Sequence, residues 1–106
     1  MKIALAQLNY TIGAFEDNTH RIIEVIQKAK SQDADLVVFS ELSVCGYPPL
    51  DLLEQKAFIQ KCNKAVETIL PYTAGIAVIL GAPTINKGSL GKNLFNSALF
   101  IVGGKI

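Results

Sequence analysis

The sequence predicts an α/β protein with a mixed sheet, in the element order β-α-β-α-β-β. Apolar runs typical of buried strands occur at residues 3–8, 36–39 and 75–83, and again after residue 93. Two stretches with apolar residues at helical spacing separate the first three strands. Only a short polar segment joins the last two strands, which indicates an antiparallel hairpin and therefore a mixed sheet.

The first strand and helix are predicted from residues 3–31. The run from Ile3 to Leu8 is apolar on both faces, which suits a strand that is covered on both sides. Asp17 or Asn18 is expected to cap the helix that follows, because either side chain accepts a hydrogen bond from a free backbone N–H. The apolar stripe of this helix consists of Ile22, Ile23, Val25, Ile26 and Ala29.

The second half of the pattern continues from residue 36 to the end. A strand over residues 36–39 is followed by "GYPP", which stops regular structure because proline lacks an N–H. Asp51 is expected to cap a second helix, which ends near Pro71. Gly103-Gly104 predicts a type I′ hairpin turn, since glycine tolerates the positive φ required there. Because the sequence stops two residues later, we expect the chain to be the first part of a larger domain.

Composition and charge exclude several classes of protein. The 106 residues carry ten basic and nine acidic side chains without a basic stripe, which argues against nucleic-acid binding. No apolar run reaches the roughly 18 residues of a membrane span. The apolar run at the amino terminus is too short for a signal peptide. We therefore expect a cytoplasmic protein whose two cysteines are reduced thiols.

Glu41 is the strongest catalytic candidate. It follows the buried strand directly, at the carboxyl end where α/β sheets place ligand crevices. Partial desolvation there would raise the pKa of the carboxyl group toward the range of a general base. The alternatives are a solvated loop acid and a cap for the turn.

Cysteine and histidine offer weaker candidates. Cys45 has no cation nearby to stabilise a thiolate, so we interpret it as a small buried side chain. Cys62 falls within a helical pattern and has the same interpretation. His20 is the one histidine and is placed on the polar side of the first helix. No second histidine or cysteine pair completes a metal site, so none is predicted.

Three polar features near the predicted sheet edge remain. Tyr47 lines a pocket or packs over the edge of the core. Asn96 hydrogen-bonds toward Glu41 or caps the start of the last strand. The segment "GSLGK" at residues 88–92 departs from a phosphate-binding loop in both glycine spacing and the residue after lysine, so it predicts a polar turn.

Several of these segments resemble the nitrilase (carbon–nitrogen hydrolase) superfamily. The matching segments are "IALAQLN", "NTHRIIEVIQKAKSQDADLVVFSEL" and "NSALFIVGGKI". The segment "ELSVCGYPPLDLL" is more similar to the amino-terminal glutaminase domains of the glutamine-dependent NAD synthetases, although those domains commonly have an acid at the position of Leu50. The resemblance covers essentially the whole chain but less than half of a nitrilase domain. It implies the amino-terminal part of an α-β-β-α sandwich.

The resemblance also implies a catalytic set of glutamate, lysine and cysteine. The glutamate corresponds to Glu41, acting as general base, and Tyr47 and Asn96 are candidate substrate-pocket residues. The lysine and the nucleophilic cysteine are expected beyond residue 106, so neither Lys105 nor Cys45 is assigned to them, and the fragment alone is expected to be inactive. Glutamine is the implied substrate. ATP and magnesium are implied only for a synthetase domain that would follow, and this fragment is expected to hold no cofactor.

Two other functions stay open on the sequence. One is a stand-alone nitrilase-type amidase, which keeps the chemistry and changes the substrate. The other is a non-enzymatic α/β module that acts through protein contact, since half of the residues are hydrophobic and a contact surface would account for that. Because the last strand leaves an unpaired edge, we also expect self-association, as a homo-oligomer.

Overall fold

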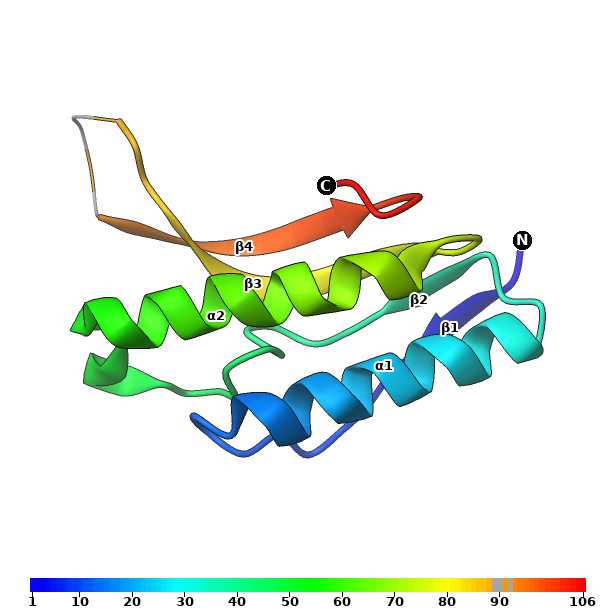
Figure 1. Cartoon of the computed structure of the whole chain (residues 1–106), viewed down its shortest axis with the longest axis horizontal. Helices are drawn as coiled ribbons and strands as arrows, with labels where there is room; N and C mark the ends of the chain where they lie inside the picture. The colour runs from blue at the N-terminus through cyan, green and yellow to red at the C-terminus, as the bar shows by residue number, and fades with distance from the viewer. Residues whose placement is uncertain (89–90, 92) are drawn as a thin grey trace.

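The computed structural model describes residues 1–88, 91 and 93–106 and contains one four-stranded sheet in the order β1-β2-β3-β4. The first two pairings are parallel and the third is antiparallel, so the predicted mixed sheet is confirmed. Figure 1 shows the sheet behind two long helices. The strands are β1 (Ile3–Leu5), β2 (Leu36–Val38), β3 (Ala77–Ile85) and β4 (Leu94–Ile101).

Both helices, α1 (Phe15–Ser31) and α2 (Lys56–Ile69), cover the same face of the sheet (Figure 1). Their apolar stripes and the sheet residues that face them form the core. Two short 3₁₀ helices, η1 (Leu50–Glu54) and η2 (Leu70–Thr73), flank α2. The fully buried aliphatic residues of this core are Ile22, Ile26, Val37, Val44, Ile69, Val78, Leu80 and Ile101.

Both helix starts differ from the predicted caps. Helix α1 begins at Phe15 after Ala14, so Asn18 lies inside the helix. Its buried amide accepts a hydrogen bond from the N–H of Thr11 at 3.1 Å and donates to the carbonyl of Thr11 at 2.9 Å. Asp51 lies in η1, and α2 begins only after Gln55. Asn18 thus serves the loop before α1 instead of the helix end, and Asp51 falls outside α2 altogether.

The face of the sheet opposite the helices is open, which corrects the expectation that the first strand is covered on both sides. Leu5 of β1 is 73% exposed. Leu5 begins a row of paired residues that crosses all four strands. The other members of the row are Val38, Ile79 and the exposed Phe100 of β4. The structure thus contains one helix layer and one sheet layer. The apolar row is what a second sheet would cover in the predicted α-β-β-α sandwich.

The turn after β4 has the predicted geometry. Gly103 has φ +60° and Gly104 has φ +79°, as both central residues of a type I′ turn require. The N–H of Val102 donates to the carbonyl of Lys105 at 2.9 Å, and the N–H of Lys105 donates back at 3.1 Å. The glycine pair therefore starts a hairpin, as its sequence indicates.

Candidate active site

The chain leaves the sheet directly after β2, and this departure forms the turn that carries Glu41. The N–H of Phe39 still donates to the carbonyl of Ile79 in β3 at 2.9 Å. The next rung of the ladder would use Gly81. Its N–H instead donates to the hydroxyl of Ser43, and that hydroxyl donates to the carbonyl of Gly81, both at 3.3 Å. The N–H of Val44 also donates to that carbonyl, at 3.3 Å. A serine side chain therefore replaces the main-chain partner of the Gly81 N–H, and residues 40–42 pass over β3.

Gly81 makes room for this crossing. A Cβ atom added there would lie 2.5 Å from the backbone nitrogen of Leu42 and closer still to the carbonyl oxygen of Ser40. Real Cβ atoms do not approach other heavy atoms this closely, so any side chain at position 81 would displace the turn. Leu42 itself is buried and has φ +49°, a strained conformation for a residue with a side chain. The position of Glu41 thus depends on a close backbone contact with β3.

Pro83 lies in β3 at a level of the sheet that β2 does not reach. In the β3–β4 ladder Pro83 is opposite Asn96, and alternate residues of β3 direct their N–H groups toward the β2 side. Proline lacks an N–H and is normally confined to strand edges. It is tolerated here because β2 has already ended at this level of the sheet.

Asn96 reaches Glu41 from the far side of β3. Its side-chain Nδ2 donates to Oε1 of Glu41, although the two residues are 55 positions apart. The two side chains meet over the open face of the sheet. The alternative role of Asn96 as a cap at the strand start is not observed among the described residues, because Asn96 is the third residue of β4. The structure therefore brings together two of the three predicted site residues.

The position of Glu41 after a buried strand predicted partial burial of its side chain. The described residues instead leave this side chain exposed. The physical reason is the side on which the turn lies. The helices bury the other face of the sheet (Figure 1), and Glu41 meets Asn96 on the exposed side of β4.

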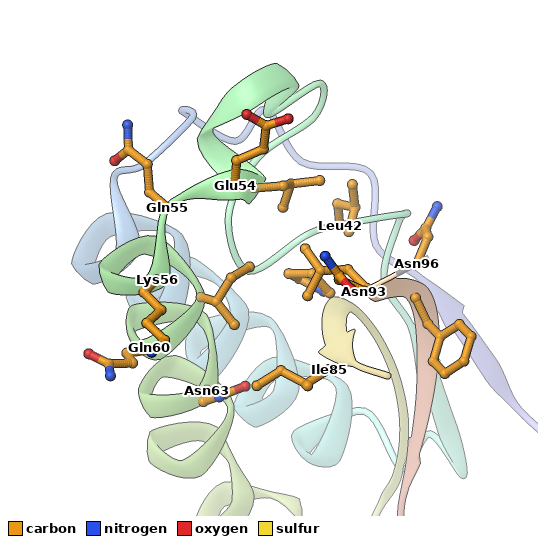
Figure 2. Close-up of a pocket in the computed structure, with 14 residues that line it drawn as sticks. Leu42, Glu54, Gln55, Lys56, Gln60, Asn63, Ile85, Asn93 and Asn96 are labelled. Carbon is orange, nitrogen blue, oxygen red and sulfur yellow. The ribbon is translucent and has the colours of Figure 1, made fainter. Parts of the chain in front are cut away.

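A groove of about 920 Å³ opens beside Asn96, between the start of α2 and the β3–β4 hairpin. Figure 2 shows Gln55, Lys56 and Gln60 on the helix side, with Asn93 and Asn96 on the strand side. Its remaining walls are largely apolar. Such grooves bind small molecules through apolar contact and a few polar groups. The other lining residues are Leu42, Leu53, Glu54, Ile59, Asn63, Pro83, Ile85, Leu94 and Phe95.

Tyr47 lies apart from this groove. Its side chain is 62% exposed and is not among the lining residues that the structure describes. Its exposure decides between neither predicted placement, as a pocket wall or over the core edge. Its part in substrate binding stays a prediction.

The two cysteines meet in the core, which their separation in the sequence did not indicate. Cys45 is fully buried at the end of the Glu41 turn, and its thiol lies 3.5 Å from the carbonyl oxygen of Gly46. Cys62 of α2 is also fully buried. A hydrogen bond with Cys45 and burial raise the pKa of the Cys62 thiol. Both side chains contribute to packing, which agrees with their interpretation from the sequence.

Neither thiol is therefore expected to react in the folded protein. The thiolate is the reactive form. Although the hydrogen bond with Cys62 lowers the pKa of the Cys45 thiol, both side chains are fully buried, so a reagent cannot reach either sulfur. Iodoacetamide labelling followed by peptide mass spectrometry should find Cys45 and Cys62 unmodified until the protein unfolds. The variant Ser31→Cys, at an exposed helix position, provides a reactive control. Rapid modification of Cys45 at native pH would contradict the assignment.

The remaining polar candidates have ordinary surroundings. His20 lies on the exposed side of α1, as predicted, with its Nε2 2.8 Å from Oε1 of Glu24. Within the described residues, no group of three histidine, cysteine or acidic side chains could hold a metal ion. No described helix is long and apolar enough to cross a membrane. The turn predicted at residues 88–92 lies partly outside the described residues.

Ser43 and Gly81 are the site residues that sequence reasoning missed. An isolated glycine within an apolar strand pattern indicates close backbone approach, and "ILGAP" contains one. The proline two residues later is a second signal, because it is unfavourable in a strand paired on both sides. Ser43 carried no comparable signal.

Three comparisons relate the chain to known proteins. Residues 2–106 match the carbon-nitrogen hydrolase family. The chain is 39% identical over 107 residues to a glutamine-dependent NAD(+) synthetase of Xanthomonas campestris pv. campestris (strain 8004), covering 100% of the chain and 19% of that protein. The chain thus spans about a fifth of the length of the curated relatives it matches.

Solved structures of two enzymes have a fold similar to that of this chain. A glutamine-dependent NAD+ synthetase from Acinetobacter baumannii, in complex with ADP, aligns with TM-score 0.87 and 35% identity, over 98% of this chain and 19% of that one. An amidase from Nesterenkonia sp. AN1 aligns with TM-score 0.71 and 25% identity, over 78% of this chain and 32% of that one. That structure is of a mutant amidase in which a glutamine replaces a glutamate, with the acetamide moiety of fluoroacetamide added covalently at its active site cysteine.

Proposed function

The chain belongs to the carbon-nitrogen hydrolase family, and we propose that it provides the general base of the glutaminase site in a glutamine-dependent NAD synthetase. The observation that carries the proposal is the placement of Glu41. Its carboxylate follows β2, projects over the open face of the sheet and is held by Asn96 beside a groove. The relatives that match the whole chain are glutamine-dependent NAD synthetases, which supports glutamine as the substrate.

The chemistry assigned to Glu41 is proton transfer in two stages. It takes the proton of a cysteine thiol, and the thiolate attacks the amide carbon of glutamine. The tetrahedral intermediate then expels ammonia, which leaves with the proton returned by Glu41, and a thioester remains. In the second stage Glu41 takes a proton from water, and hydrolysis of the thioester releases glutamate and restores the thiol. The covalent addition at the active site cysteine of the Nesterenkonia amidase supports a cysteine nucleophile, and because a glutamine replaced a glutamate in that protein, the support extends to the nucleophile alone.

The other two members of the catalytic set are assigned to the gene product outside these 106 residues. Cys45 is buried against α2 and is therefore unsuited to attack a substrate at Glu41. ATP and magnesium are assigned to a synthetase domain that amidates nicotinic acid adenine dinucleotide. The amide hydrolysis assigned to Glu41 uses neither group. The cytoplasmic location and the homo-oligomer stay predictions.

The complete gene product tests the proposal. It should form NAD from nicotinic acid adenine dinucleotide and ATP with glutamine as the nitrogen source, with glutamate released in step. Failure to hydrolyse glutamine would remove the proposal.

The 106-residue chain assayed alone should release no ammonia from glutamine above the buffer rate. Its general base has no exposed thiol to activate, since both cysteines of the chain are buried. The measurement is ammonia release at high protein concentration, with the complete gene product as the positive control. Turnover by the isolated chain would contradict the assigned division of the catalytic set.

A stand-alone amidase is the second candidate, favoured by the match to the Nesterenkonia amidase. The same general base would then serve a simple aliphatic amide. Hydrolysis of acetamide or butyramide without hydrolysis of glutamine would favour this function over the first.

A further inference from the structure

Asn96 and Glu41 belong to strands that are not neighbours, and their contact depends on the missing side chain between them. β3 separates β2 from β4 in the sheet. Asn96, Ala98 and Phe100 alternate onto the open face of β4, the face over which the Glu41 turn passes. Because Gly81 presents only hydrogen at this point of β3, the turn lies low over the sheet. The amide of Asn96 can then reach the carboxylate across one strand.

Among the residues that the structure describes, few charged side chains surround this contact. The strands below Glu41, β3 and β4, consist entirely of uncharged residues. Within its own turn the titratable neighbours are Cys45, which is buried, and Tyr47, which is exposed. Tyr10 meets the turn at Ser40, and Glu54 and Lys56 line the groove beyond Asn96. An amide donor is therefore the polar group that directly holds the carboxylate.

We propose that Asn96 is a positioning residue for Glu41: it fixes one carboxylate oxygen so that the other faces the reacting thiol and water. Asn96 also lines the groove, but its role is assigned to the base and not to substrate binding. The inference rests on the proposed function. A hydrogen bond to the charged form of a carboxyl group also favours that form, so removal of the amide should alter the pH dependence of the reaction. The amide thus sets the direction of the base.

The test uses the complete gene product with Asn96→Ala and Asn96→Asp, and measures glutaminase kcat and KM across pH. For Asn96→Ala we expect kcat/KM to fall about tenfold or more, because misplaced catalytic groups lose rate steeply. The acidic limb of the kcat/KM profile should move up by about one pH unit, since the donor to the carboxylate is lost. Asn96→Asp should move it further in the same direction, because a second carboxylate opposes ionisation of the first. KM for glutamine should stay within about twofold.

Ser97→Ala is the matched control. Ser97 is the next residue of β4, points to the opposite face and bonds the hydroxyl of Thr84 at 2.7 Å. Its variant should disturb the same strand without moving the acidic limb. A raised KM with an unmoved limb in Asn96→Ala would place Asn96 in the substrate pocket and overturn the inference, as would unchanged kinetics. Full activity of Glu41→Gln would instead remove the proposed function itself, and this inference with it.

Discussion

Replacing Glu41 with glutamine in the complete gene product is expected to lower glutaminase kcat/KM by about 10²–10⁴-fold, the usual contribution of general-base catalysis. Glutamine keeps the shape of the side chain, and its amide oxygen can still accept the hydrogen bond from Asn96. It cannot take a proton from the thiol or from water. Both proposed stages therefore lose their base while the turn stays in place.

Two comparisons make this result specific. NAD formation from added ammonia should be unchanged in Glu41→Gln, because free ammonia bypasses the glutaminase site. Glu24→Gln makes the same chemical change on the exposed side of α1, outside the turn that carries Glu41. It should leave the glutamine-dependent and the ammonia-dependent rates of NAD formation intact. Glutamine-dependent activity that survives in Glu41→Gln would remove Glu41 from the mechanism.

The fold was predictable where local chemistry decides it. The glycine pair at residues 103–104 predicted its turn because the required φ values admit few other residues. The helix caps were wrong because Asn18 binds a neighbouring segment and Asp51 falls in a separate 3₁₀ helix before α2. Asn18 binds the loop before its helix, a contact that becomes visible only when Thr11 and Val44 are placed. A capping rule based on residue type alone cannot distinguish these roles.

For the site, local sequence predicted the position of Glu41 but not its contacts. Glu41 follows a buried strand, and this position alone indicated a crevice. The contact with Asn96 requires strand order and register, because a residue 55 positions away meets Glu41 only if β4 lies on the far side of β3. The exposure of Glu41 depends on which face the helices cover. Ser43 was missed since its hydroxyl replaces a backbone partner, a role that the sequence does not mark.

Gly81→Ala is expected to impair glutaminase activity from a residue that takes no part in the chemistry. The added methyl group would overlap the backbone of residues 40–42, so the turn must rise from β3 and carry Glu41 with it. A displacement of about 1 Å at a catalytic group can cost about 10²-fold in rate. Forcing a methyl group into a packed site also costs about 1–3 kcal/mol of stability. We expect both losses in the complete gene product, measured by glutaminase kinetics and thermal unfolding.

Gly75→Ala separates the two effects. Gly75 precedes β3 with φ +83°, and a Cβ there would meet no described heavy atom within 4 Å. Alanine is strained in this conformation, which costs about 1–2 kcal/mol, but the Glu41 turn is untouched. Assayed where both variants are folded, Gly75→Ala should keep its glutaminase rate while Gly81→Ala loses it. Equal rates in the two variants would mean that the close approach at Gly81 serves stability alone, and that the position of Glu41 is set elsewhere.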